Sequence, residues 1–339
     1  MKILIIDTYY EKFLKTFYKK NRNLKNCEYD FQLKALLNSN FGTSDAYSYY
    51  FNKNNWEAKD LIVNCLLLQK EWGKKKVIKI SDFRSRIPYK FFKLPIIGKK
   101  LGNINGLLNI AKEQIKAFKP EILYCQDLSF FPEEILLDIK KENNIRLIVG
   151  QIACPLPPKS FINPYDLILT SFPHFVNRLR NDGKNCDYFK IGFDQRILSK
   201  TVQNDRDIDF SFVGGISKYH NYASKNIEYL IKNAKLQVYG YGVNKLPFNS
   251  NIRRHHKGER WGLDMYNVLS RSKISFNRHI NVAENNANKL QSVAENIFTL
   301  VRKNFFLWWL FALEHQVVLL PTAREEVVDS RNQNFVAIL

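Results

Sequence analysis

The sequence predicts an α/β protein built from two domains, each with a parallel sheet covered by helices. Short apolar runs alternate with helix-like segments along the chain, which is the pattern of such sheets. The pattern restarts after the polar stretch 199–206, which is therefore the predicted linker. A length of 339 residues also suits two domains. We expect one domain at residues 1–198 and a second at 199–339.

The first domain opens on the strand Lys2–Asp7 (KILIID), which is apolar on both faces and ends in an acidic residue. The segment 41–45 (FGTSD) leads into a helix rich in tyrosine. Residues 70–105 are basic and irregular, and the proline-rich segment 154–158 is a loop. The remaining elements expected here are strands at residues 58–64, 120–125, 146–150, 166–171 and 188–193, and helices at 107–118, 133–142 and from about 175.

The second domain repeats the alternation of strand and helix. A strand at 208–213 runs into Gly214 and Gly215, and a helix follows at 221–233. A strand at 236–239, a helix at 261–269 and a strand at 272–277 complete the pattern. This order predicts a second α/β unit.

Composition limits the classes of partner. The formal charge is +20, from 52 basic and 32 acidic residues, so phosphates, nucleic acid or an anionic membrane surface would be attracted. No nucleic-acid-binding signature accompanies this charge, which makes nucleic acid an unfavoured partner. Neither a signal peptide nor an apolar run of membrane-spanning length is present. Five scattered cysteines, with Cys65 and Cys125 in apolar runs, predict buried free thiols and a cytoplasmic protein.

The strongest candidate for a phosphate site is the Gly214–Gly215 pair. Glycines after a strand and before a helix let backbone N–H groups approach a phosphate, but they also turn loops for geometric reasons, and both readings stay open. Arg278, at the end of the last predicted strand, suits a two-pronged hold on a diphosphate. His279 would contact the same ligand or be structural. Glu284 would bind ribose hydroxyls or cap a helix.

Several segments together resemble the CgeB-like glycosyltransferases, which are similar to the retaining GT-B enzymes of group 1. The matching segments are KIGFD, DFSFVGGIS, VYGYG, GERWGLDMYNVLSRSKISFNRHI and VAENNAN in the second half, and PEILYCQDLSFFP and DLILTSFPHF in the first. The resemblance extends over most of residues 1–288 and is most specific at 258–288.

The resemblance implies a GT-B fold, in which two Rossmann-like domains face a cleft. It implies an acceptor on the first domain, a nucleotide-diphosphate sugar on the second, retention of configuration, and neither a metal nor a cofactor. Lys218 and Arg278 would neutralise the diphosphate at Gly214 and Gly215. His174, Asp127 and Asp45 are candidates to take the acceptor proton, and the two acids could equally cap helices.

If the resemblance holds, the first loop of the chain offers a further candidate binding segment. Gly42, Thr43 and Ser44 would contact the acceptor or a phosphate, or would form a turn before the helix.

After Asn288 the chain departs from the family pattern. Residues 289–339 contain no glycine and match none of the expected closing segments, so the second domain is expected to be incomplete and its tail frameshifted or diverged. This departure motivates an alternative function from another class, a non-catalytic protein that binds a sugar or nucleotide. A third alternative, nucleic-acid binding, would give affinity that falls steeply with salt.

Overall fold

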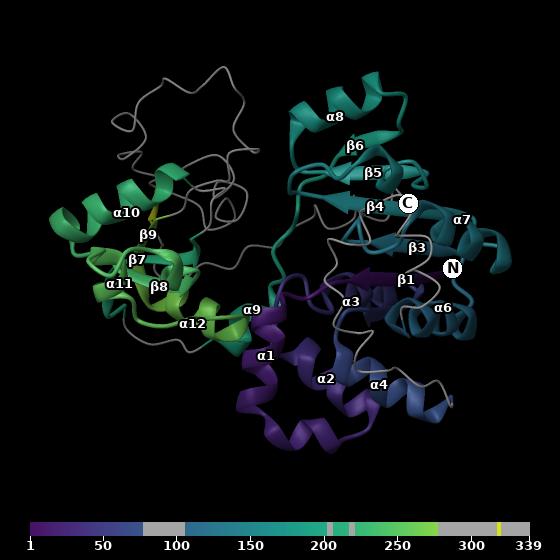
Figure 1. Ribbon diagram of the computed structural model, residues 1–339, viewed down its shortest axis with the longest axis horizontal. Helices are drawn as coiled ribbons and strands as arrows, with labels where there is room; N and C mark the ends of the chain where they lie inside the picture. The colour runs from purple at the N-terminus through teal and green to yellow at the C-terminus, as the bar shows by residue number, and fades with distance from the viewer. Residues whose placement is uncertain (77–105, 202–205, 217–220, 277–316, 320–339) are drawn as a thin grey trace. The chain divides into compact units, whose positions relative to one another are not determined.

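The computed structural model describes residues 1–76, 106–201, 206–216, 221–276 and 317–319. The chain divides into two compact units, Met1–Phe189 (unit 1) and Lys190–Leu339 (unit 2). Both units contain a sheet of mostly parallel strands accompanied by helices (Figure 1). The predicted α/β class is confirmed.

Unit 1 is built on a six-stranded sheet with the order β2-β1-β3-β4-β5-β6. Every neighbouring pair in this sheet is parallel. The strands are β1 (Lys2–Asp7), β2 (Glu57–Ile62), β3 (Ile122–Cys125), β4 (Leu147–Ile152), β5 (Leu167–Thr170) and β6 (Cys186–Tyr188).

Strand β1 is the place where the order of this sheet reverses. The chain passes from β1 to β2 on one side and then crosses to β3 on the other, so β1 lies between them. Ile3 pairs with Ala58 of β2 and with Ile122 of β3. The run Ile3 to Ile6 is at most 4% exposed, which explains why its sequence is apolar on both faces.

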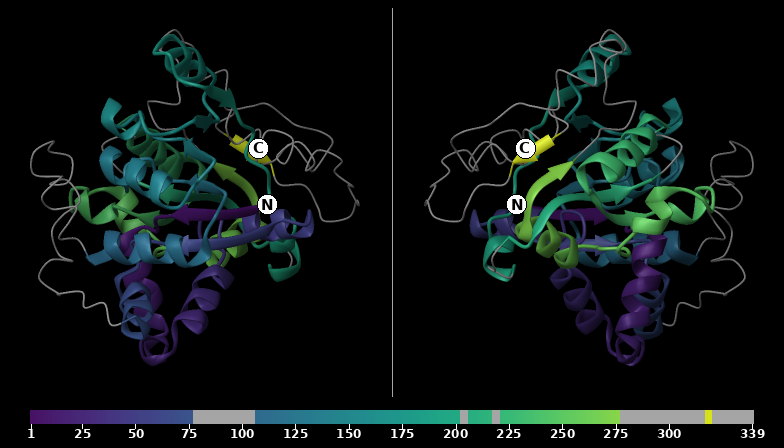
Figure 2. Two further views of the ribbon diagram at one scale, coloured as in Figure 1. Left: turned by 90° about the vertical axis from the view of Figure 1, so that its right-hand side faces the viewer. Right: turned by 90° about the vertical axis from the view of Figure 1, so that its left-hand side faces the viewer.

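Helices cover this sheet. Helix α3 packs against β1 and β2, and α8 packs against β5 and β6. Helices α1 and α2, drawn in purple, lie toward the β2 edge, whereas α8 lies beside β6 (Figures 1 and 2). The helices of unit 1 are α1 (Glu11–Lys20), α2 (Tyr29–Asn38), α3 (Ala46–Lys53), α4 (Leu66–Lys75), α6 (Gly106–Phe118), α7 (Glu133–Glu142) and α8 (Pro173–Asn181), with short 3-10 turns at η1 (Arg22–Asn26) and η4 (Lys159–Phe161).

Two sequence predictions for unit 1 are wrong. The strand expected at 188–193 ends at Tyr188, because its neighbour β5 ends at Thr170 and offers no partner beyond that point. Residues 66–75 form helix α4, whereas the sequence predicts an irregular segment from residue 70 onward. Cys65 and Cys125 are 1% and 0% exposed, as predicted for buried free thiols.

Unit 2 contains a four-stranded sheet with the order β10-β9-β7-β8. Strands β7, β8 and β9 run parallel, and β10 pairs antiparallel with β9. The order reverses at β7, which lies between β8 and β9. The strands are β7 (Ile208–Gly215), β8 (Gln237–Tyr241), β9 (Ser272–Phe276) and β10 (Val317–Leu319).

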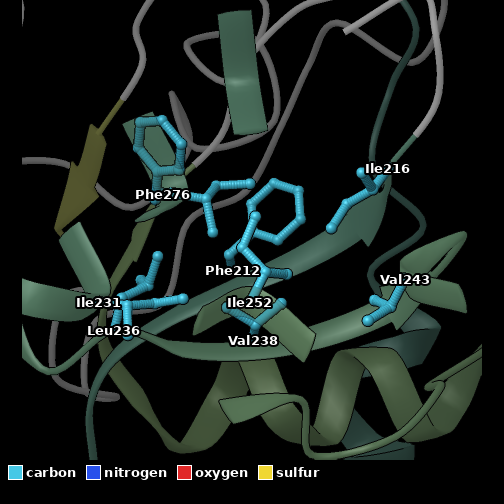
Figure 3. Close-up of a cluster of buried hydrophobic side chains, with 9 residues drawn as sticks. Phe212, Ile216, Ile231, Leu236, Val238, Val243, Ile252 and Phe276 are labelled. Atoms are coloured by element: carbon cyan, nitrogen blue, oxygen red, sulfur yellow. The ribbon is translucent and has the colours of Figure 1, made fainter. Parts of the chain in front are cut away.

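The core of unit 2 joins its sheet to helix α11 (Figure 3). Ile252 of α11 is fully buried and belongs to one cluster with Phe212, Val238 and Phe276. The helices of this unit are α9 (Arg196–Lys200), α10 (Asn221–Ala234), α11 (Asn251–His255) and α12 (Leu263–Arg271), with a 3-10 turn at η6 (Val243–Lys245).

Three expectations for unit 2 need correction. The predicted linker 199–206 begins inside helix α9, and residues 202–205 lie outside the described residues. The helix expected from Trp261 begins at Leu263, because Gly262 has a φ of +52° and interrupts the helical backbone. The strand expected at 236–239 extends to Tyr241.

Among the helices of the described ranges, none combines the length and the apolar character that crossing a bilayer requires.

Candidate functional site

The carboxyl ends of β1 and β3 bring four polar residues together in unit 1. Asp7 is the last residue of β1, and Thr8 follows it. Gln126 and Asp127 follow the last residue of β3. Because the strand order of a parallel sheet reverses between these two strands, their carboxyl ends are where ligands of such sheets bind. These four residues form the core of the candidate site, which we call the β1–β3 site.

A hydrogen bond joins the two sides of the β1–β3 site. Thr8 Oγ1 donates to Asp127 Oδ2 at 2.9 Å. The other carboxylate oxygen of Asp127, Oδ1, accepts the backbone N–H of Ser129 at 2.9 Å and fixes the turn after β3. Asp127 therefore both positions Thr8 and shapes its own loop.

Asp7 is the residue of this site whose acidity is most altered. Burial raises its pKa from 3.8 to about 7, the N–H of Thr8 at 2.7 Å from Asp7 Oδ1 opposes that shift, and the negative charge of Asp127 adds to it. A carboxyl group with a pKa near 7 exchanges its proton readily at neutral pH. This is the property that a general acid or base requires.

The loop 40–44 lies beside Asp7. A Cβ atom on Gly42 would lie 3.9 Å from Asp7 Oδ2, and Thr43 Oγ1 donates to Gln126 Oε1 at 2.9 Å. The backbone here is unusual, since Asn40, Gly42 and Ser44 have φ values of +53°, +60° and +51°. The structure thus brings two of the three predicted loop residues to the β1–β3 site.

Ser44, the third loop residue, has a structural contact. Its hydroxyl donates to the backbone oxygen of Leu37, and the residue is buried. The ring of Phe41 anchors the same loop by stacking on Phe13 with centroids 4.1 Å apart. Gly42 and Thr43 are therefore held rigidly against the site.

Amide groups extend the β1–β3 site toward β4. Gln151 Oε1 accepts the hydroxyl groups of Tyr124 at 2.7 Å and Tyr47 at 3.1 Å. Gln126 Nε2 and Ser171 Oγ are buried without a hydrogen-bond partner among the described residues. Since an unpaired buried donor is costly, these atoms indicate that a bound ligand or water completes their bonding.

Of the other two predicted proton acceptors, His174 lies elsewhere in unit 1, whereas Asp45 directly follows the loop 40–44. His174 is at the start of α8, after β5, and stacks on Phe172 with centroids 5.7 Å apart. Because β5 is three strands from β1, roughly 14 Å separates their ends. Asp45 occupies the N-cap position of α3 without a side-chain capping hydrogen bond. Burial raises the pKa of Tyr9, and the charges of Asp7, Asp60 and Asp45 add to that shift.

In unit 2, the paired glycines lie at the carboxyl end of β7, where that sheet reverses. A Cβ on Gly215 would lie 2.4 Å from the ring of Tyr241, and a Cβ on Gly214 would lie 2.9 Å from the ring of Phe212. Close packing of aromatic rings therefore supplies a structural reason for both glycines. A phosphate near their backbone is compatible with this reason but is not required by it.

An aromatic stack lies beside these glycines. Tyr241 and Trp261 are nearly parallel, with centroids 4.9 Å apart, and Trp261 Nε1 donates to Glu259 Oε2 at 3.3 Å. Sequence reasoning missed this stack because it placed Trp261 inside a helix. The alternation of tyrosine and glycine in YGYG was the available signal, since it sends both tyrosines to one face of β8.

Four predicted site residues lie outside the described residues: Lys218, Arg278, His279 and Glu284. Their placement stays a prediction.

No protein-family model and no curated protein matches the chain. Among solved structures, a UDP-N-acetylglucosamine 2-epimerase is similar at 10% identity and a TM-score of 0.40, with 81% of this chain and 73% of that chain covered. The S. aureus MnaA–UDP co-structure has 13% identity, a TM-score of 0.38 and the same coverage. Arabidopsis thaliana UGT89C1 complexed with UDP-L-rhamnose has 9% identity and a TM-score of 0.32, with 77% and 69% covered.

Similarities this weak carry no argument about function. What the structure itself defines is a class: an α/β protein with two units, each of which has its polar or glycine-rich loops at the reversal point of a mostly parallel sheet.

Proposed function

We propose that this protein is a glycosyltransferase that moves a sugar from a nucleotide-diphosphate sugar to a hydroxyl group of an acceptor. Unit 1 binds the acceptor and unit 2 binds the donor. The reaction proceeds with retention and without a metal, as the resemblance in sequence implies. Free cysteines throughout support a cytoplasmic location.

The observation that carries this proposal is Asp7. A partly buried carboxyl group with a pKa of about 7 stands at the reversal point of a parallel sheet, where ligands of such sheets bind. Sugar transfer to a hydroxyl group requires a base that accepts one proton near neutral pH, and Asp7 has that capacity.

In the proposed reaction one bond forms, one bond breaks and one proton is transferred. The acceptor oxygen forms a bond to the anomeric carbon, and the bond from that carbon to the diphosphate oxygen breaks with its electrons. The nucleotide diphosphate leaves as an anion. Asp7 accepts the hydroxyl proton, and Asp127, through Thr8, keeps the loop after β1 in place.

The chemistry of the β1–β3 site also fits a polyhydroxylated acceptor. An amide can donate to one hydroxyl and accept from another, and two such side chains, Gln126 and Gln151, lie along the site. The unpaired Gln126 Nε2 would donate to an acceptor hydroxyl. His174, after β5, and Asp45, after the loop 40–44, remain proposed as secondary contacts.

For the donor, we propose that the backbone of Gly214 and Gly215 receives the diphosphate and that Lys218 and Arg278 neutralise it. His279 and Glu284 would contact the sugar and the ribose. The Tyr241–Trp261 stack lies beside Gly215 and supports an aromatic wall at this position.

The direct test is hydrolysis of UDP-, GDP- and ADP-sugars by the full chain, followed by transfer to candidate glycans. We expect turnover of one donor and a loss of about 10² to 10⁴ in kcat for Asp7→Asn, which removes the base. Asp138→Asn, an exposed acid on α7, is the matched control and should leave kcat unchanged. Full activity of Asp7→Asn would exclude the proposed base.

A second candidate is a non-catalytic protein that binds a sugar or nucleotide. The observation that favours it is the tight aromatic packing at Gly214 and Gly215, which explains these glycines without catalysis. Calorimetric binding of UDP, GDP or ADP in the absence of any turnover would identify this function.

A further inference from the structure

The loop between η6 and α11 in unit 2 holds Phe248 far out in solvent. Its side chain is 85% exposed, more than any other large apolar residue of the described ranges. Pro247 precedes it, and the backbone N–H of Ser250 donates to Pro247 O at 3.1 Å, which closes a turn with Phe248 at its corner. An aromatic side chain at the tip of a closed turn contributes nothing to the core.

The turn is held rigidly on the body of unit 2. Glu228 of α10 accepts hydrogen bonds from the side chain of Ser250 and from the backbone N–H groups of Asn251 and Ile252, at 2.5, 3.1 and 3.3 Å. Ile252 is fully buried in the core (Figure 3). Arg253 Nη1 donates to Leu246 O at 3.2 Å and ties the two ends of the loop together. Phe248 is therefore presented on a fixed support.

Basic residues lie on both sides of this turn in the sequence. The segment from 235 to 258 contains five lysines and arginines and no acidic residue: Lys235, Lys245, Arg253, Arg254 and Lys257. Lys245, Arg254 and Lys257 are exposed, and no acidic partner is present for them among the described residues. The guanidinium group of Arg253 lies 3.9 Å from the centre of the Phe248 ring. We call Phe248 and these five cations the Phe248 surface.

We propose that the Phe248 surface docks on a membrane that contains anionic phospholipids. An aromatic side chain enters the boundary between headgroups and acyl chains, and lysine and arginine bind the phosphates around it. Lys245 of η6 and Arg253 and Arg254 of α11 directly flank the loop that carries Phe248, so both features belong to one short part of the chain. The formal net charge of +20 would also attract the whole protein to an anionic surface.

A single-stranded nucleic acid is the other anionic polymer with apolar faces. It is disfavoured here because a base needs a free ring face for stacking, and Arg253 covers one face of Phe248. Insertion into a bilayer requires only that the ring protrude.

The test is co-sedimentation of the full chain with vesicles of phosphatidylcholine containing about 30% phosphatidylglycerol, compared with vesicles of phosphatidylcholine alone. We expect binding to the anionic vesicles. Phe248→Ser and Arg254→Glu should each weaken it about tenfold, because they remove the inserted ring and reverse one charge.

Matched controls separate the Phe248 surface from the general charge of the protein. Phe31→Ser removes an aromatic side chain of α2 that is 69% exposed, and Lys116→Glu makes the same charge change on α6. Both should bind as the parent protein does. Equal losses in the controls, or no binding by the parent protein, would overturn the proposal.

Insertion has its own signal. Phe248→Trp should show a blue shift of tryptophan emission when anionic vesicles are added, because the indole leaves water. The proposal would be overturned if the emission does not shift and the vesicles do not bind. If a short single-stranded DNA then binds and the Phe248 and Arg254 variants weaken that binding, the surface is assigned to nucleic acid instead.

Discussion

The hydroxyl group of Thr8, which follows β1, donates a 2.9 Å hydrogen bond to the carboxylate of Asp127, which follows the neighbouring strand β3. The two residues are 119 positions apart in the chain. This bond links the loops after β1 and β3 at the point where the strand order reverses. It also leaves the neighbouring carboxylate of Asp7 beside a second negative charge. Burial is the main cause of the raised pKa of Asp7, and the order of the sheet adds to it by bringing Asp127 near.

The raised pKa of Asp7 predicts that stability falls as pH rises from about 4 to about 7. The folded protein keeps the proton on Asp7 to about pH 7, whereas the unfolded chain loses it near 3.8, so in this window the folded state binds more protons. Asp7→Asn has no charge to bury, so at pH 8 it should be more stable than the parent by about 4 kcal/mol. Urea unfolding at pH 5 and pH 8 measures the difference.

The gain should be smaller at pH 5 and absent below about pH 4, and Asp138→Asn should show none at any of these pH values. A difference between Asp7→Asn and the parent that does not change with pH would contradict the assignment.

Asp127→Asn should move the pH dependence of activity. Removing the charge of Asp127 removes one cause of the raised pKa of Asp7, while burial, the larger cause, remains. The midpoint of the kcat profile should therefore move to lower pH by about half a unit. Thr8→Val keeps the charge on Asp127 and should lower kcat without moving the midpoint downward. A midpoint that is the same in Asp127→Asn and the parent would show that the two acids do not interact.

Gly240→Ala should strongly destabilise unit 2. The added Cβ would lie 1.8 Å from Gly214 O, and Gly240 has a φ of +136°, which L side chains rarely adopt. We expect a loss of more than about 3 kcal/mol in the free energy of unfolding. Gly183→Ala is the control for backbone strain alone, because its φ is +75° and its surroundings are open, and it should cost about 1 kcal/mol. Similar losses in both variants would mean that the Gly214 contact is relieved by a small shift.

Glu228→Gln should weaken the support of the Phe248 turn. Burial acts to raise the pKa of Glu228, but hydrogen bonds from Ser250, Ile252 and Asn251 outweigh it, so the net pKa lies below the usual value. Such a group stabilises the fold at neutral pH and loses that effect as pH falls through its folded pKa. We expect a loss of about 1 kcal/mol at pH 7, discounted for exposure, which shrinks as pH falls below the ordinary pKa of a glutamate. Urea titrations at neutral and at acidic pH test this, and a loss of the same size at both would assign the effect to packing.

Elements with a clear apolar pattern could be predicted from the sequence. The bounds of β1 and α7 agree with the structure residue for residue, because each carries an unbroken run or a regular apolar face. Helix α1 also carries a regular apolar face, with Phe13, Leu14 and Tyr18 buried, so a signal for it was present in the sequence. Helix α2 has a weaker pattern, because the polar Gln32 is one of its buried residues. The segment after Tyr188 resembles a strand because its apolar residues alternate, although the sheet provides no partner there.

The candidate site was predictable only in part. The sequence places Asp7 and Asp127 at the ends of strands, but which strands are neighbours depends on the order of the sheet. The raised pKa of Asp7 follows from that order and from burial, so its role was missed. The close packing of Gly215 against Tyr241 likewise joins residues of two strands, and no pattern along one strand contains it.

During synthesis, strand β1 is present for a time without the two strands that flank it in the sheet. It is made before either neighbour, since Ile3 pairs with Ala58 and with Ile122. At about 5 to 20 residues per second, roughly 6 to 24 seconds pass before the second neighbour is translated. The apolar strand has two unpaired edges until β2 is made and one until β3 is made, and chaperones bind such segments on nascent chains. Slow translation ahead of β3 would lengthen this exposure, so the yield of folded protein should depend on the speed of the ribosome over the first third of the chain.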